Sequence, residues 1–173
     1  MKGESMREEP DGQVKRWDYK GLYVEHSTKD DALYVARHLR GADRREVSAI
    51  TKQPPLQVIR DGIDASSPCY TIRLTYSGKP CGIFGSREAA YPQSGLVWLV
   101  GTDDLITHST TFLRHSRQWL ATMHEHYRLL YNVIDARNEV HLRWLEWLGF
   151  EFIQDVPRYG VERRKFILFR RYV

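Results

Sequence analysis

The fold is decided by the segment NEVHLRWLEWLGF, which occupies residues 138–150. Its apolar residues recur at helical spacing as far as Leu148, and Gly149 is the residue type that most readily adopts the left-handed conformation after a helix. Phe150 then opens a stretch with strand character that continues to Val156. The segment therefore predicts a short helix, a glycine that ends it, and a strand whose first residue enters the core.

Upstream of this segment, the sequence predicts a strand, a long helix and a second strand. Leu96–Val100 is an unbroken apolar run, which is typical of a central strand buried on both faces. Leu130–Ile134 is a second short apolar strand. Between them a helix should start near Thr107 or His108, since one helical face carries the stripe of Phe112, Trp119, Leu120, Met123 and Tyr127. A strand–helix–strand unit of this kind makes a right-handed crossover, so the two strands should be parallel neighbours.

The remaining elements complete a mixed sheet. A strand over Leu22–His26 leads into a helix capped by Ser27 or Thr28 and ended by Gly41, and strict alternation from Cys69 onward predicts an antiparallel hairpin. Further elements are expected as helices at Asp43–Ile50 and Leu56–Ile63, a returning hairpin strand at Pro80–Ser86, and a last strand at Phe166–Arg171. This order predicts an α/β fold of mixed α+β character, with a mostly antiparallel sheet, a central parallel strand pair and helices on both faces.

The length and composition indicate one folded domain. Of the 173 residues, 42% are hydrophobic and 28% are charged, which excludes a disordered chain. No apolar run approaches the twenty residues of a membrane-spanning helix, so no membrane partner is expected. Residues 1–20 contain Gly3, Pro10 and Gly12 and show no apolar periodicity, so we expect a flexible charged arm ahead of a single domain at residues 21–173. The net charge of +4 is too small to indicate a nucleic-acid partner by itself.

Cysteine and histidine spacing gives no sign of a disulfide or a metal site. Cys69 and Cys81 flank the predicted hairpin turn at distances that differ by about six residues, so they should lie far apart and stay reduced. Among the seven histidines, His124 and His126 surround Glu125, but residues two apart on a helix point to different faces. We therefore expect no metal ion.

The spacing of Asn138, Gly149 and Phe150 resembles the short helix of the GNAT (GCN5-related N-acetyltransferase) superfamily, and the element order over residues 21–171 is the order of that fold. The resemblance implies a cleft for acetyl-CoA between the strands at residues 96–100 and 130–134. Its candidate cofactor-binding residues would come from the end of the first strand, the start of the long helix and the start of the short helix: Val100, Thr107, His108, Ser109, Thr110 and Asn138.

Two departures from the GNAT pattern argue against catalysis. The glycine-rich loop that closes on the CoA pyrophosphate is replaced by residues 101–111, which lack a glycine pair and carry Asp103 and Asp104, two carboxylates that would repel a diphosphate. The tyrosine that commonly protonates the departing thiolate is replaced by Leu145, which cannot donate a proton. Candidate substitutes are Glu88 as a general base and His141 facing the cleft, although a solvated loop carboxylate and a structural histidine are the simpler interpretations.

A closer resemblance comes from residues 98–103, 112–119 and 132–150; it covers roughly residues 20–155, and its most specific stretch is residues 135–150. These segments resemble a family of small GNAT-like proteins of short-tailed phages, the internal virion protein A family, which is associated with virion morphogenesis. That resemblance implies a non-catalytic protein without a cofactor, which binds other virion proteins and is found in the host cytoplasm and the virion. The alternative is an acyl-CoA-dependent N-acetyltransferase that acts on a phage or host protein.

Candidate partner-binding residues lie near the two ends of the chain. Trp17 and Tyr19 are aromatic anchors on the predicted arm, and aromatic anchors dominate protein interfaces. Arg163 and Arg164 begin a basic segment that could contact nucleic acid. The simpler interpretation, which we prefer, is that these charges protect a terminal edge strand from pairing with another sheet.

Overall fold

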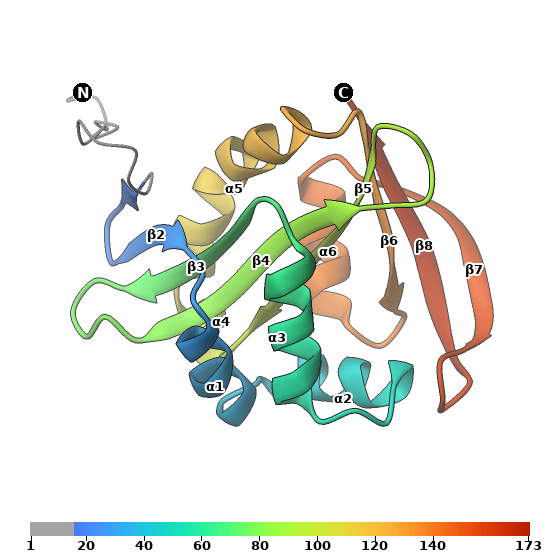
Figure 1. The fold of residues 1–173 in the computed structure, drawn as a ribbon, viewed down its shortest axis with the longest axis horizontal. Coiled ribbons are helices and arrows are strands. Elements are labelled where there is room, and N and C mark those ends of the chain that lie inside the picture. The colour runs from blue at the N-terminus through green and yellow to red at the C-terminus, as the bar shows by residue number, and fades with distance from the viewer. Residues whose placement is uncertain (1–15) are drawn as a thin grey trace.

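The computed structural model describes residues 16–173, so residues 1–15 of the predicted arm lie outside the described part of the chain. The described residues form one eight-stranded sheet with six helices (Figure 1). The strands are β1 (Trp17–Asp18), β2 (Leu22–His26), β3 (Cys69–Leu74), β4 (Pro80–Glu88), β5 (Ser94–Gly101), β6 (Leu129–Asp135), β7 (Glu151–Tyr159) and β8 (Arg164–Tyr172). The helices are α1 (Lys29–Arg37), α2 (Gly41–Ile50), α3 (Pro55–Ala65), α4 (Asp103–Thr107), α5 (Ser109–His124) and α6 (Glu139–Trp147).

The sheet order is β1-β2-β3-β4-β5-β6-β8-β7, and the predicted fold class is confirmed. β5 and β6 are parallel, and the other neighbouring strands are antiparallel. α5 forms the crossover between the parallel pair. The last strand in sequence, β8, lies between β6 and β7, so the C-terminal hairpin forms one end of the sheet and β7 is its edge strand.

Each face of the sheet has its own core. One core joins α1 and α3 to the sheet through residues such as Val35, Ile59 and Ile83, which are all buried. The other core joins α5 and α6 to the opposite face and includes Trp119 and Trp144. Figure 1 shows α3 in front of β4 and α6 behind the sheet. The prediction that helices cover both faces is therefore correct.

The first strand corrects the predicted start of the domain. Trp17 is only 4% exposed, because β1 pairs with β2 and brings its indole edge-on against Tyr70. The Tyr19 ring stacks on His115, and its hydroxyl accepts a hydrogen bond of 3.0 Å from the indole nitrogen of Trp119. These two aromatic residues therefore belong to the packed domain, and neither is an exposed anchor on an arm.

Two helix boundaries differ from the prediction, and the first differs because the chain contacts the end of β5. α1 ends at Arg37, before Gly41. The chain leaves the helix there because Leu39 forms an isolated bridge with Thr102. The N–H of the next residue, Arg40, donates to the carbonyl of Gly101 at 2.9 Å. Gly41 instead begins α2. The predicted long helix is preceded by the short helix α4, and α5 follows after a single residue, His108.

Candidate functional site

The parallel strands β5 and β6 separate after a short stretch of pairing. They share only three residue pairs, from Ser94 with Leu129 to Leu96 with Tyr131, although both strands continue beyond them. Asn132 lies where the strands part, and its side-chain amide donates to the carbonyl of Val97 at 2.9 Å. Beyond this bridge the backbones diverge and leave a gap in the middle of the sheet.

A cavity of about 510 Å³ occupies this gap. It borders residues of both cores, because side chains alternate along β5: Val97 and Leu99 pack with the α5–α6 core, and Trp98 and Val100 pack with the α1–α3 core. Leu96–Val100 are accordingly half-buried, whereas the sequence predicted a strand buried on both faces. These residues face the cavity where, in a continuous sheet, a neighbouring strand would pack against them.

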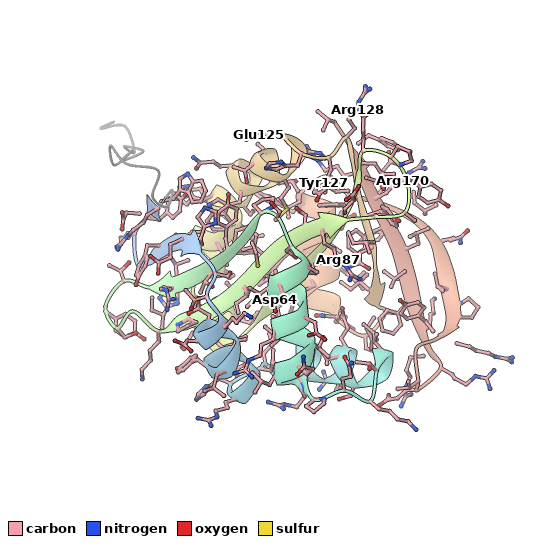
Figure 2. All side chains as sticks on the ribbon, in the orientation of Figure 1. Asp64, Arg87, Glu125, Tyr127, Arg128 and Arg170 are labelled. Atoms are coloured by element: carbon pink, nitrogen blue, oxygen red, sulfur yellow. The ribbon has the colours of Figure 1, made fainter. Side chains whose placement is uncertain are left out.

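One side of the cavity opens to solvent, and exposed lining residues mark its mouth. They are Gln53 and Asp61 from the region of α3, together with Arg87 near the end of β4. Figure 2 shows Arg87 close to α3, on the side where the chain turns from β4 toward β5. The hairpin of β7 and β8 bounds the cavity elsewhere, since Tyr159 contributes to the lining.

The inner end of the cavity is closed by a hydrogen-bonded network that joins α2 to the ends of β5 and β6. The Gly101 N–H donates to Oδ2 of Asp43 at 2.8 Å, and the guanidinium of Arg40 donates to the same carboxylate at 2.7 Å. Arg40 also donates to Oδ1 of Asn138 at 2.7 Å, and Nδ2 of Asn138 donates to Asp43 at 3.2 Å. All three side chains are buried, so an internal carboxylate already satisfies the backbone donor at the end of the central strand.

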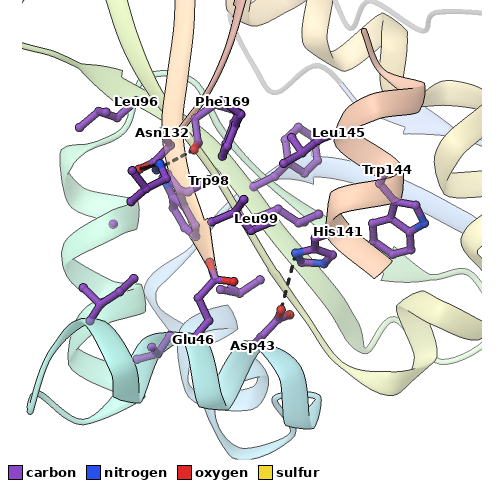
Figure 3. A pocket seen from close by; sticks show the side chains of 18 of the residues that line it. Asp43, Glu46, Leu96, Trp98, Leu99, Asn132, His141, Trp144, Leu145 and Phe169 are labelled. Atoms are coloured by element: carbon purple, nitrogen blue, oxygen red, sulfur yellow. Dashed lines mark hydrogen bonds and ion pairs between the residues drawn. The ribbon is translucent and has the colours of Figure 1, made fainter. Parts of the chain in front are cut away.

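Two titratable side chains extend this network into the cavity lining (Figure 3). Nδ2 of Asn138 donates to Oε2 of Glu46 at 2.9 Å, and burial raises the pKa of Glu46 to about 7 in spite of that bond. His141 reaches from α6, and its Nδ1 lies 3.6 Å from Oδ1 of Asp43. Burial lowers the pKa of His141 to about 4, although the Asp43 carboxylate favours the charged ring. At neutral pH the histidine is therefore uncharged and Glu46 is near its titration midpoint.

The predicted cofactor residues divide into two groups. Val100 borders the cavity and Asn138 holds the network at its inner end. The residues at the start of α5 do not line the cavity: they are Thr107, His108, Ser109 and Thr110. The short helix α4 carries the beginning of α5 away from the gap, and Thr111 donates to the carbonyl of Lys20 beside the β1–β2 turn.

The two predicted catalytic candidates, His141 and Glu88, lie in different surroundings. His141 lines the cavity. Glu88 is exposed at the end of β4, opposite Gly95, and lies outside the cavity lining, which is the position of a solvated carboxylate. Sequence reasoning missed Asp43 and Glu46. Their spacing of three residues does place both on one face of α2, but nothing in the sequence says that this face meets the ends of β5 and β6.

The predicted partner residues at the C-terminal end lie on a turn that is fixed to α2. The N–H groups of Val161 and Glu162 donate to the carbonyls of Ile50 and Ala49 at 3.3 and 3.2 Å. Arg163 and Arg164 follow and are exposed, and Arg164 pairs with Glu162 at 3.2 Å. Both arginines are accessible at the surface.

Other kinds of site were sought in the described residues. Cys69 and Cys81 are free and buried, and burial raises the pKa of Cys69 to about 11 and that of Cys81 to about 12. Within residues 16–173, no three side chains of His, Cys, Asp or Glu are grouped so that they could hold a metal ion. In the same range, no helix combines the length and the apolarity needed to cross a membrane.

Comparison with known proteins relates the fold to acetyltransferases. No protein-family model matches the sequence, and no curated protein matches it. A ribosomal-protein-S5-alanine acetyltransferase from Vibrio fischeri has a similar structure, with a TM-score of 0.66, 14% identity, and coverage of 91% of this chain and 96% of the other. Ard1 from Thermoplasma volcanium gives a TM-score of 0.69 at 14% identity, with 88% and 98% covered. An acetyltransferase of the GNAT family from Streptococcus pneumoniae gives 0.62 at 14% identity, with 88% and 99% covered. At this level of identity the likeness establishes the GNAT fold alone.

Proposed function

We propose that this chain is a non-catalytic GNAT-fold protein that does not use CoA and acts by binding other proteins. The observation that carries the proposal is the Asp43 carboxylate on the Gly101 N–H. In a fold whose strand ends receive an anionic cofactor, backbone donors at this place would face a phosphate. Here they face a buried internal anion, so a diphosphate would have to displace Asp43 and leave Arg40 without its partner.

Charge and position give further support. Asp103 and Asp104 lie in the first turn of α4, directly after the central strand, and repel an approaching diphosphate. The first residues of α5, which would supply N–H donors, lie outside the cavity lining. Leu145 lines the cavity at the place where a proton donor would be needed. The residues present therefore do not fit CoA.

The partners that we propose are other virion proteins of a short-tailed phage, with the chain present in the host cytoplasm and the virion. This part of the proposal is supported by the resemblance of residues 98–103, 112–119 and 132–150 to the internal virion protein A family. It is tested by mass spectrometry of particles and assembly intermediates of the phage that encodes the chain. We expect the protein, with cross-links to a second virion protein; its absence from all of these samples contradicts the proposal.

An acyl-CoA-dependent N-acetyltransferase is the second candidate, and one observation favours it. The cavity is of a size typical of small-molecule sites, and it holds a carboxylate, Glu46, whose pKa lies near 7. A group that titrates at neutral pH is suited to accept a proton from a substrate.

Calorimetry with acetyl-CoA separates the two candidates. We expect no binding at concentrations up to about 100 μM, which corresponds to a free energy weaker than about −5 kcal/mol. A dissociation constant at or below that value, or acetyl transfer to any amine acceptor, contradicts the proposed function. Glu46→Gln then identifies the group responsible, since loss of transfer with unchanged cofactor binding would assign the proton-accepting role to Glu46.

A further inference from the structure

The turn between β7 and β8 carries positive charge that the proposed function does not use. Residues 158–165 contain one carboxylate, Glu162, and four cationic side chains: Arg158, Arg163, Arg164 and Lys165. Arg164 is paired with Glu162 at 3.2 Å. Arg158 and Arg163, by contrast, are exposed, and neither makes an ion pair with another residue in the range 16–173. Two guanidinium groups without a counter-charge therefore lie at the surface of this turn.

Protection of a sheet edge does not explain these charges. β8 pairs with β6 on one side and with β7 on the other, so it is an internal strand. Arg163 precedes β8, and Arg164 is its first residue, opposite Tyr159 of β7. The sequence-based interpretation, in which both arginines protect a terminal edge strand, is therefore wrong.

Two of the arginines occupy a backbone conformation that arginine seldom adopts. Arg158 has a φ of 56° and Arg163 a φ of 53°. In this left-handed region a β-carbon crowds the backbone, so glycine and asparagine are the usual residues and a longer side chain lowers stability. Residues that cost stability in this way gather at functional sites, which points to a contact that these guanidinium groups make outside the fold.

The backbone of the turn is fixed on the end of α2 (Figure 1). The N–H groups of Val161 and Glu162 donate to the last two carbonyls of α2 at 3.3 and 3.2 Å. Gly160 lies against the Ala49 carbonyl with no room for a β-carbon. A fixed turn presents its arginines in one arrangement, so little backbone entropy is lost when a partner binds.

A further arginine lies beside the turn. The N–H of Ala136 donates to the carbonyl of Lys165 at 3.1 Å, which brings the chain after β6 to the start of β8. Arg137 follows, and its side chain is paired with Asp135 but remains 38% exposed. It therefore adds accessible N–H donors at the side of the turn.

We propose that the β7–β8 turn binds the phosphate backbone of a nucleic-acid duplex without regard to sequence. Arg158 and Arg163 are the principal contacts, and Arg137 lies at their side. A guanidinium group offers a planar pair of N–H donors that matches two phosphate oxygens, and phosphates supply the negative charge that the turn lacks. Contacts of this kind position a protein on a duplex and carry no sequence information.

Other partners fit this surface less well. The core of a protein interface is depleted of charge and rich in aromatic residues, whereas a nucleic-acid interface is much more positive. The exposed apolar residues beside the turn, Ile50 and Val161, are both aliphatic. Tyr159 is the only aromatic residue in residues 158–165, and its ring packs on that of Phe166 with 4.8 Å between the centroids. No ring in this segment is therefore free to stack on an unpaired base, as binding of single strands would need.

This inference goes beyond the proposed function and does not depend on it. The proposed function fails if acetyl-CoA binds, whereas this inference fails if the turn does not bind a duplex. Arg158 and Arg163 lie outside the cavity lining, so each failure can be observed while the other proposal stands.

The test measures binding of a DNA duplex of about 20 base pairs to the full chain by fluorescence anisotropy. For two to three phosphate contacts, the dissociation constant should rise about 10- to 40-fold between about 50 and 200 mM salt. The double variant Arg158→Asn, Arg163→Asn should weaken binding about tenfold at the lower salt concentration and reduce the salt dependence. Asparagine tolerates a positive φ, so this variant should melt at or above the wild-type temperature.

The matched control is the double variant Arg114→Gln, Arg143→Gln. It removes the same charge from exposed positions on α5 and α6, and it should keep the affinity for the duplex within about twofold of the wild type. Equal weakening in the two double variants overturns the proposal, as does undetectable binding of the wild type at about 50 mM salt.

Three further results would also overturn it. One is a polyglutamate peptide of equal charge, or a single strand of equal length, that binds at least as tightly as the duplex. Another is an asparagine variant that melts well below the wild type, because the arginines would then stabilise the turn itself. The last needs no variant: the duplex should shift the side-chain NMR signals of Arg158 and Arg163, and shifts confined to other residues contradict the proposal.

Discussion

Replacing Glu46 with Gln should stabilise the protein at pH 8 and leave its stability unchanged at pH 4. In the folded state the pKa of Glu46 is raised from 4.5 to about 7. Below pH 4.5 the carboxyl is protonated in both the folded and the unfolded chain, so it behaves like the neutral glutamine. Between pH 4.5 and 7 the unfolded chain loses the proton while the folded chain keeps it, so the contribution of Glu46 to stability falls as pH rises.

The size of the effect follows from the pKa difference. Each pH unit in this window costs about 1.4 kcal/mol, which gives on the order of 3 kcal/mol above pH 7. The variant should therefore match the wild type at pH 4 and exceed it by about 2–3 kcal/mol at pH 8, allowing for relaxation of the site. Urea unfolding at pH 4, 6 and 8 measures the two free energies of unfolding under identical conditions.

The comparison has an internal control and a clear contrary result. Glu88→Gln makes the same chemical change at an exposed position, and its difference from the wild type should stay within about 0.5 kcal/mol at every pH. If Glu46→Gln gives the same difference at pH 4 and pH 8, or lowers stability at pH 8, burial of an unpaired carboxylate at the end of the cavity is refuted.

Three further predictions concern the same region. Wild-type protein should lose stability as pH falls from 6.5 to about 4, because the folded protein keeps the His141 ring neutral while the unfolded chain takes up a proton. His141→Leu should not show this loss, and equal acid dependence of unfolding in both proteins would refute the prediction. Asp43→Asn should lower the free energy of unfolding by about 3–5 kcal/mol, because Arg40 is left buried without its partner. Calorimetry with pyrophosphate should also detect binding to this variant that the wild type lacks. A variant that unfolds like the wild type contradicts the buried pair. Gly160→Ala should cost about 2 kcal/mol or more in urea unfolding, because a β-carbon there meets the Ala49 carbonyl at a positive φ of 68°. Gly78→Ala has a similar φ of 70°, but its β-carbon would make only ordinary van der Waals contact with the Tyr23 hydroxyl, so it should cost only about 1 kcal/mol. Equal losses would contradict docking of the hairpin tip.

Local patterns in the sequence were sufficient to predict every strand of the sheet except β1. The alternation from Cys69 and the apolar runs around Leu96 and Leu130 are properties of single strands, and the structure contains strands at each place. The glycine that ends α6 is equally local, since Gly149 adopts a φ of 82°. These features are decided within a few residues, and the order of elements then restricts the fold to few topologies.

The site depended on contacts that no local pattern records. The residues around Trp17 are polar, so the sequence places it on an arm; its burial depends on the pairing of β1 with β2, which the local sequence does not indicate. Asp43 and Glu46 read as ordinary carboxylates on a helix surface, and they acquire their role only because Leu39 and Arg40 tie the start of α2 to the end of β5. Val100 and Asn138 were identified through resemblance to a known fold, which carries this long-range information.

The position of β8 has a consequence for synthesis of the chain on the ribosome. β8 covers the whole length of β6, from Leu129 opposite Tyr172 to Asp135 opposite Phe166. Until residues 164–172 have emerged, β6 is an open edge strand, and the last carbonyls of α2 lack the donors that the hairpin tip supplies. A nascent chain up to about residue 150 therefore exposes the apolar lining of the cavity and an unpaired strand edge, the combination that recruits chaperones or leads to aggregation. Completion of the cavity is a late, C-terminal event.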